Sequence, residues 1–191
     1  MTVKDSKYGD LTGKVYTKTM VFTNMDGIKS LEGSPTEVKG TFNIDFNELT
    51  SLKYAPKIIG EVFSISSNPI TSLEGSPEKI GGHFFCDSLK IKNLKGCTPH
   101  IGGGLDCKNN NQLVSLMTDG PLMIEGDFDC RNCPKLEDPI GDIIKYQIFA
   151  PRYYTDKGSF PFRKIEDRFN AYRLSRRVTR PSMRKLLGLD K

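Results

Sequence analysis

The chain has 191 residues, of which 37% are hydrophobic and 27% are charged, with a net charge of +5 at pH 7. It holds no run of 18 apolar residues and does not open on a charged segment followed by an apolar one, so we expect neither a membrane span nor a secretory signal. The length suits one domain with an appendage, and we expect a protein of a reducing cytoplasm.

Residues 1–29 are predicted to form an N-terminal cap with a degenerate first repeat. Residues 14–23 (KVYTKTMVFT) are rich in β-branched and aromatic side chains, which is typical of a strand. Counting one repeat length back from the next unit places Val21 and Thr23 at the two inward positions of this strand. We expect a hairpin here that covers the end of the core.

Residues 30–140 contain five successive units of 21 to 23 residues that share the pattern S-L-x-x-x-P-x-x-(V/I)-x-G-x-F-x-(I/C)-x-x-N-x-(L/I). Alternation of two apolar residues puts both side chains on one face of a short strand. This period and this pattern are typical of a leucine-rich repeat. The inward pairs are Phe42 and Ile44, Phe63 and Ile65, Phe84 and Cys86, Leu105 and Cys107, and Phe128 and Cys130.

The rest of each unit predicts a turn and a return leg. Asn47, Asn68 and Asn110 follow the strand, where an amide can bond the backbone of its own turn and of the next one, whereas Leu89 takes this position in the third unit. Proline at the return leg favours an extended or 3₁₀ conformation. Leucines close the core from the far side at Leu52, Leu73, Leu94 and Leu116, and the prolines are Pro35, Pro56, Pro77, Pro99 and Pro121.

The fold class that follows is a leucine-rich-repeat solenoid. Its parallel β-sheet is expected on the concave side, with an extended or 3₁₀ convex side and a short α-helical, basic C-terminal segment. Such a fold presents a surface and does not by itself imply a chemistry.

The five cysteines are interpreted as core residues. Cys130-x-x-Cys133 resembles half of a zinc site, but such a site needs two converging pairs and only one pair is present. Cys86, Cys107 and Cys130 fall at the second inward position, where a thiol acts as a small apolar filler. We therefore expect no metal, no cofactor and no disulfide.

The outward residues of the predicted strands form a candidate protein-binding face. Phe85 is an outward aromatic side chain at its centre, and the paired positions Asp106 and Asp129 should lie side by side, with Lys108 and Arg131 close enough to compensate their charge. The plainer alternative is a solvated sheet with ion pairs between rungs. The candidate residues are Asn43, Asp45, His83, Phe85, Asp87, Asp106, Lys108, Asp127, Asp129 and Arg131.

A catalytic role for this face is not expected. His83 beside Asp87 or Asp106 is its one acid–base combination, and no serine stands in a nucleophile turn. Residues 102–104 (GGG) precede a strand instead of a helix, so we interpret them as the glycine position of the repeat and not as a phosphate-binding loop.

Residues 141–191 are predicted to be a C-terminal cap, a linker and a basic helical tail. Residues 142–150 are apolar enough for a cap strand or helix, and residues 151–162 read as a turn-rich linker with four aromatics. From residue 151 onward twelve Lys or Arg face four Asp or Glu, a net charge of +8. Ile165, Phe169 and Tyr172 share one face of the predicted tail helix.

Three interpretations of the tail stay open. Its apolar stripe docks on the solenoid end as a cap; its arginines bind nucleic acid, ribosomal RNA included; or it binds an acidic protein partner or the acidic face of this chain. The basic residues that would carry the second or third role are Arg163, Arg173, Arg176, Arg177, Arg180, Arg184 and Lys185.

The units, with S-L-E-G-S-P at the turns and F-x-(I/C)-x-x-N-x-L at the strands, resemble the short leucine-rich repeats of bacterial secreted effectors. They resemble still more the small repeat proteins common in tailed-phage genomes. The resemblance covers about residues 20–140. It implies a phage-encoded protein of the host cytoplasm, and the ubiquitin-ligase activity of some effectors should be absent because no cysteine follows Cys133. We expect a non-enzymatic module that binds and modulates a host protein, or alternatively a nucleic-acid- or ribosome-associated protein acting through the tail.

Overall fold

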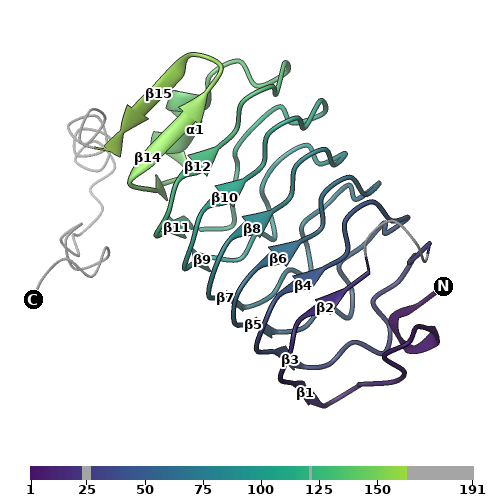
Figure 1. The fold of residues 1–191 in the computed structure, drawn as a ribbon. Coiled ribbons are helices and arrows are strands. Elements are labelled where there is room, and N and C mark those ends of the chain that lie inside the picture. Colours follow the sequence, from purple (N-terminus) through teal and green to yellow (C-terminus); the bar gives the residue numbers. More distant parts are fainter. Residues whose placement is uncertain (23–26, 121, 163–191) are drawn as a thin grey trace, which may run out of the picture.

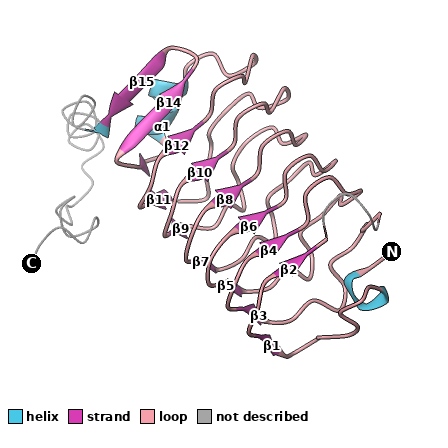
Figure 2. Ribbon diagram, viewed as in Figure 1, coloured by secondary structure: helices cyan, strands magenta, loops and turns pink. Residues whose placement is uncertain are grey.

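The computed structural model describes residues 1–22, 27–120 and 122–162. These residues wind into a parallel β-solenoid of about six turns, with two sheets running along its length (Figures 1 and 2). The seven-stranded sheet runs in the order β1 (Val15–Tyr16), β3 (Glu37–Val38), β5 (Ile58–Ile59), β7 (Lys79–Ile80), β9 (His100–Ile101), β11 (Leu122–Ile124) and β13 (Ile148–Phe149).

The eight-stranded sheet carries the strands that the repeat pattern predicts. Its order is β2 (Met20–Val21), β4 (Phe42–Asn43), β6 (Phe63–Ser64), β8 (Phe84–Phe85), β10 (Leu105–Asp106), β12 (Phe128–Asp129), β14 (Arg152–Thr155) and β15 (Gly158–Pro161). All its neighbours are parallel except β14 and β15, which pair antiparallel. The described helices are a 3₁₀ turn at Val3–Asp5 and α1 at Pro139–Lys145.

The predicted inward residues form the core. All five inward pairs are buried, and so are the four far-side leucines. The rings of Phe42 and Phe63 stack with centroids 6.2 Å apart, and those of Phe63 and Phe84 with centroids 5.1 Å apart. Because successive units pair in register, equivalent side chains lie one above another and a continuous apolar column runs along the solenoid.

The asparagine amides bond the backbone of their own turn, as predicted, but the second rung that they contact is the preceding one and not the next one. Asn68 accepts from the backbone N–H of Leu49 at 2.9 Å and donates to the carbonyls of Ile44 at 2.8 Å and Ile65 at 3.0 Å. The amide thus joins its own turn to the preceding rung, and not to the next one. The equivalent position of the fifth unit holds Cys133, whose thiol donates to the carbonyl of Cys107 at 3.5 Å.

The return leg is extended, as predicted, and its two-residue strands hydrogen-bond into the seven-stranded sheet. Gly81, for example, donates its N–H to the carbonyl of Ile59 at 2.8 Å. Sequence analysis did not predict this second sheet. It also placed Pro99 in the proline column, where the register instead puts Thr98, which donates its hydroxyl to the carbonyl of Pro77 at 2.8 Å.

The predicted inward positions of the first strand were wrong by one residue, and the predicted hairpin is not formed. β2 pairs Met20 with Phe42, so Met20 and Phe22 are the inward residues and Val21 is 39% exposed. The spacing from Met20 to Phe42 is 22 residues, whereas Phe42 to Phe63 and Phe63 to Phe84 are 21 each. A shift of one residue moves the side chains of a strand to the other face. β1 and β2 join different sheets and form no hairpin.

The C-terminal end is closed by α1, β13 and the β14–β15 hairpin. Asp138 caps α1 by accepting from the N–H of Gly141 at 3.0 Å. Most of the predicted linker at residues 151–162 is this hairpin. Its Tyr153 and Phe160 are buried, and their rings stack with centroids 5.4 Å apart. The predicted tail helix lies outside the described residues.

None of the helices in the described part of the chain has both the length and the apolar character required to cross a bilayer.

Candidate functional site

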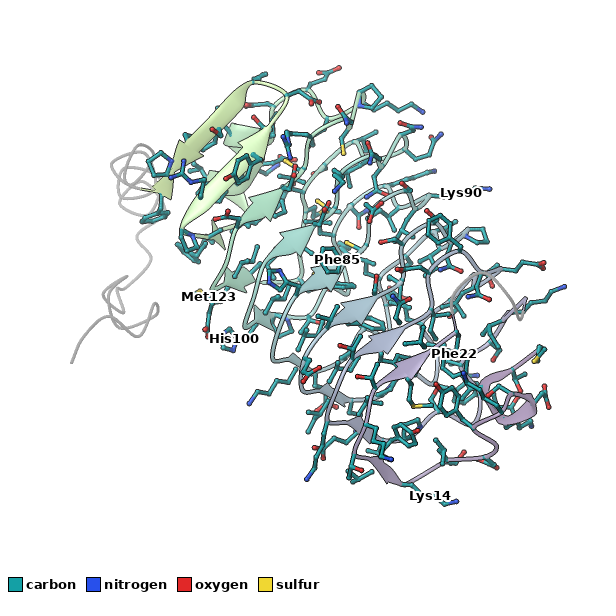
Figure 3. The ribbon with its side chains drawn as sticks, in the orientation of Figure 1. Lys14, Phe22, Phe85, Lys90, His100 and Met123 are labelled. Atoms are coloured by element: carbon teal, nitrogen blue, oxygen red, sulfur yellow. The ribbon has the colours of Figure 1, made fainter. Side chains whose placement is uncertain are left out.

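The outward residues of the eight-stranded sheet lie in rows across the strands. One row runs in register through Phe85, Asp106, Asp129 and Tyr154, on β8, β10, β12 and β14. The predicted neighbour relation of Asp106 and Asp129 is confirmed by this register. Figure 3 shows Phe85 midway along the sheet, whereas His100 and Met123 lie on the seven-stranded sheet.

A hollow of about 490 Å³ opens on this face. Gly104 lies in the lining of the hollow between His83 and Asp127, and this place is crowded: a Cβ there would lie 3.1 Å from Nδ1 of His83 and 2.9 Å from the carbonyl oxygen of Asp127. Its lining residues are His83, Phe85, Gly104, Leu105, Asp106, Gly126, Asp127, Asp129 and Tyr154.

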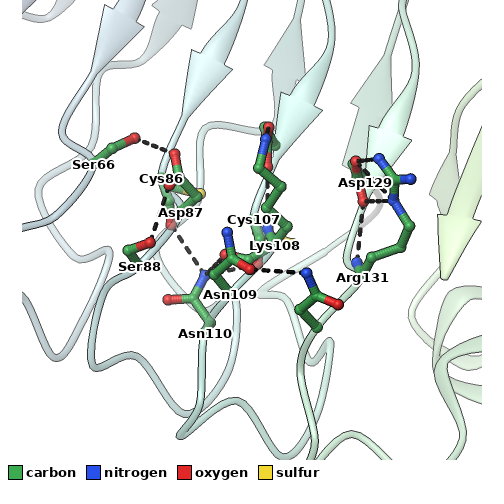
Figure 4. Close-up of polar contacts among 12 residues, drawn as sticks. Ser66, Cys86, Asp87, Ser88, Cys107, Lys108, Asn109, Asn110, Asp129 and Arg131 are labelled. Atoms are coloured by element: carbon green, nitrogen blue, oxygen red, sulfur yellow. Dashed lines mark hydrogen bonds and ion pairs between the residues drawn. The ribbon is translucent and has the colours of Figure 1, made fainter. Parts of the chain in front are cut away.

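Two carboxylates of the hollow are paired along their own strands. Asp106 accepts from Nζ of Lys108 at 2.6 Å, and Asp129 accepts from the guanidinium of Arg131 at 2.5 Å (Figure 4). Burial opposes ionisation of Asp129, but the hydrogen bonds and charge of Arg131 outweigh it and hold the pKa of that carboxyl below its usual value. Hydrogen bonding to Asp106 raises the pKa of Lys108. The compensation predicted from sequence is confirmed.

A third carboxylate has no such partner. Asp127 is exposed, and no side-chain hydrogen bond or ion pair reaches its carboxylate from within residues 1–22, 27–120 and 122–162. His83, across Gly104, accepts from the N–H of Gly104 at 3.1 Å through Nδ1, and its ring stacks on Phe85 with centroids 5.8 Å apart. The histidine is therefore held as part of an aromatic wall and makes no hydrogen bond to a carboxylate within those ranges.

Three predicted site residues lie in the N-terminal half of the face and hold it together. Asp45 accepts from the hydroxyl of Ser64 at 2.6 Å and from the N–H of Ser66 at 2.7 Å. Asp87 accepts from the hydroxyl of Ser66 and from that of Ser88 at 3.1 Å (Figure 4). Asn43 accepts from the N–H of Asp45 at 2.9 Å. The contacts of Asp45 with Ser64 and Ser66, and of Asp87 with Ser66, link successive rungs, whereas those of Asn43 with Asp45 and of Asp87 with Ser88 lie within one rung.

The ten predicted face residues therefore fall into three groups. Five line the hollow, Lys108 and Arg131 flank it, and the other three form the ladder just described. The hollow residues among them are His83, Phe85, Asp106, Asp127 and Asp129. The seven basic tail residues predicted as a second site lie outside the described residues.

Sequence analysis missed Tyr154, which closes the far side of the hollow. It was assigned to a linker, although the alternation in Arg152–Thr155 (RYYT) was the available signal of a further strand. The guanidinium of Arg131 lies over its ring at 5.2 Å. Gly104 and Gly126 were also missed as site residues, because a glycine carries no side-chain signal in the sequence and its place in a hollow depends on the residues around it.

The cysteines are free thiols. Burial raises the pKa of Cys86, Cys107 and Cys130 well above the usual value, that of Cys97 to about 12 and that of Cys133 to about 11. Within the described ranges, no group of three or more His, Cys, Asp or Glu side chains is placed to hold a metal ion.

Comparisons of the chain with protein-family models, with curated proteins and with solved structures find no match.

Proposed function

We propose that this protein is a non-enzymatic binding module that engages a partner protein through the outer face of its eight-stranded sheet, centred on the hollow. The observation that carries the proposal is Phe85, a partly buried aromatic side chain that lines a hollow of about 490 Å³ on the outer face of the sheet. Aromatic anchors in pockets contribute much of the binding energy of protein interfaces.

The frame around the hollow supports this role. Its strands belong to a stack whose inward side chains are buried and whose turns are joined by buried asparagine amides. A rigid surface loses little conformational entropy when a partner binds. His83 stacks on Phe85 and receives the N–H of Gly104, which suits a wall of a binding site better than a proton-transfer group.

The finer assignments rest on the resemblance of the repeats. We propose that the solenoid is of the leucine-rich-repeat type, that the protein is encoded by a tailed phage, and that it modulates a protein of the host cytoplasm. Surfaces on the strand side of repeat solenoids commonly bind proteins.

The test is capture of a partner from host lysate with the tagged full chain. Phe85→Ala combined with Asp106→Asn should lose the partner, because it removes the anchor and one carboxylate of the hollow. Phe46→Ala is the matched control, since Phe46 is a 62% exposed phenylalanine in the turn after β4. Circular dichroism of each variant checks folding. A partner retained by the folded double variant would contradict the proposal.

A second candidate function is favoured by the charge distribution. Residues 1–150 carry a net charge of −3 and residues 151–191 one of +8. Such a segment suits nucleic acid or a ribosome, and the affinity of such binding falls steeply with salt. Titration of the full chain with RNA and DNA at two salt concentrations tests this. Absent or salt-independent binding would remove this candidate, whereas nuclease-sensitive capture would favour it over the first.

A further inference from the structure

The charge of the hollow and its surroundings is negative. The outward residues of β8, β10 and β12 and of the turns that follow include four carboxylates and two cations. Lys108 and Arg131 pair with Asp106 and Asp129, and Asp87 accepts from neutral serine hydroxyls. Asp127 is left exposed and, among the described residues, without a counter-charge within ion-pair distance. An occupant of the hollow is therefore favoured if it brings positive charge.

The walls of the hollow are aromatic. Phe85 and Tyr154 stand at the two ends of the row that contains Asp106 and Asp129, three strand spacings or roughly 14 Å apart at about 4.8 Å per strand. The face of an aromatic ring attracts a cation, and guanidinium also stacks on it. Tyr154 already carries the guanidinium of Arg131 over its ring at 5.2 Å, so this face accommodates such a contact.

We propose that the hollow recognises an arginine side chain on an exposed segment of the partner protein, with its guanidinium paired to Asp127 and stacked on the wall formed by His83 and Phe85. This inference rests on the proposed function and names the chemistry of the partner. Arginine fits better than lysine because its planar fork binds a carboxylate through two hydrogen bonds while its face covers a ring.

The test uses the full chain and three short peptides of glycine and serine. Each carries one central residue: arginine, lysine, or citrulline, which has nearly the shape of arginine without its charge. Amide chemical shifts in NMR follow each titration. The arginine peptide should shift the amides of residues 83–85, 104–106 and 126–129, with at least tenfold weaker binding of the citrulline peptide. Equal binding of arginine and citrulline peptides, or shifts elsewhere, would overturn the proposal.

Two variants sharpen the assignment. Asp127→Asn should weaken binding of the arginine peptide about tenfold or more, because a charge-assisted hydrogen bond is lost. Glu74→Gln removes an equal charge from an exposed turn residue remote from the hollow, and should leave binding unchanged. Equal loss in both variants would show an effect of net charge alone and would overturn the proposal, as would a lysine peptide that binds as tightly as arginine.

The outcomes separate this inference from the proposed function. If the partner is still captured through Phe85 while the arginine peptide does not bind, the inference fails and the proposed function stands. If the arginine peptide binds but Phe85→Ala with Asp106→Asn retains the partner, the proposed function fails. A peptide of residues 163–191 that shifts the hollow when the single-arginine peptide does not would overturn the inference in favour of the chain's own basic segment as occupant.

Discussion

Gly81 lies directly above the carbonyl of Gly60 in the preceding rung. A Cβ built on Gly81 would stand 2.2 Å from that oxygen, closer than real Cβ atoms come. The same contact recurs one rung on, where a Cβ on Gly102 would lie 2.4 Å from the carbonyl oxygen of Gly81. The corner between the two sheets is thus a column of glycines, and the opposing atoms are backbone that cannot rotate away.

Gly81→Ala should destabilise the protein by about 2 kcal/mol or more, because the methyl group forces two rungs apart. The free energy of unfolding from urea titration measures this. Gly120→Ala is the control, since no atom of the described residues lies within 4 Å of a Cβ there, the two chain neighbours aside. Similar stability of the two variants would contradict the close stacking of the corner.

Ser34 and Ser76 occupy the same place in two S-L-E-G-S-P turns but differ in bonding. Ser76 donates its hydroxyl to the carbonyl of Leu73 at 2.7 Å, whereas the buried hydroxyl of Ser34 has no hydrogen-bond partner within the part of the chain that the structure describes. Ser76→Ala should therefore cost about 1 kcal/mol and Ser34→Ala should be neutral or stabilising. Thermal unfolding of the two variants compares them, and the reverse order would refute the assignment.

Asn68→Ala removes the amide that joins two rungs. It leaves the N–H of Leu49 and the carbonyls of Ile44 and Ile65 without that partner in the core, and we expect a loss of about 3 kcal/mol. Asn111→Ala, at an exposed site, is the control and should change stability little. Denaturant titration of both reports the difference; equal midpoints would mean that the ladder contributes nothing.

Tyr54 has φ of 70°, at the turn position where the first, third and fourth units have Gly33, Gly75 and Gly96. Residues with a Cβ are strained there, so Tyr54→Gly should be more stable than Tyr54→Ala by roughly 1 kcal/mol. Both variants lose the contact of Lys53 with the ring, which cancels in the comparison. If the alanine variant proves as stable as the glycine variant in thermal melts, the left-handed turn is not under strain.

The thiols should be inert in the folded protein. Raised pKa values keep them protonated at pH 8, and the thiolate is the reactive form, so iodoacetamide should label the folded chain far more slowly than the urea-unfolded chain. Mass spectrometry counts the labelled cysteines over time. Cys133 is the most informative site, because rapid labelling there would contradict its burial and its bond to Cys107.

Within the described residues, the sequence determined the repeat, the inward positions and the neighbours on the face. Asp106 and Asp129 could be placed side by side from sequence because a constant repeat length and a side-chain period of two define both row and direction. The same reasoning placed Val21 at an inward position in error, because the spacing between β2 and β4 is one residue longer than between the strands that follow.

Only the tertiary structure decided where the site lies and how its charges are used. The lining of the hollow includes Tyr154, which belongs to a hairpin outside the repeat pattern. The pairing of Asp129 with Arg131 could be predicted from sequence, but the lack of an ion-pair partner for Asp127 among the described residues depends on side-chain positions that the repeat does not encode. Periodic sequence specifies which face a residue occupies, whereas contacts between rungs arise only when the chain has stacked.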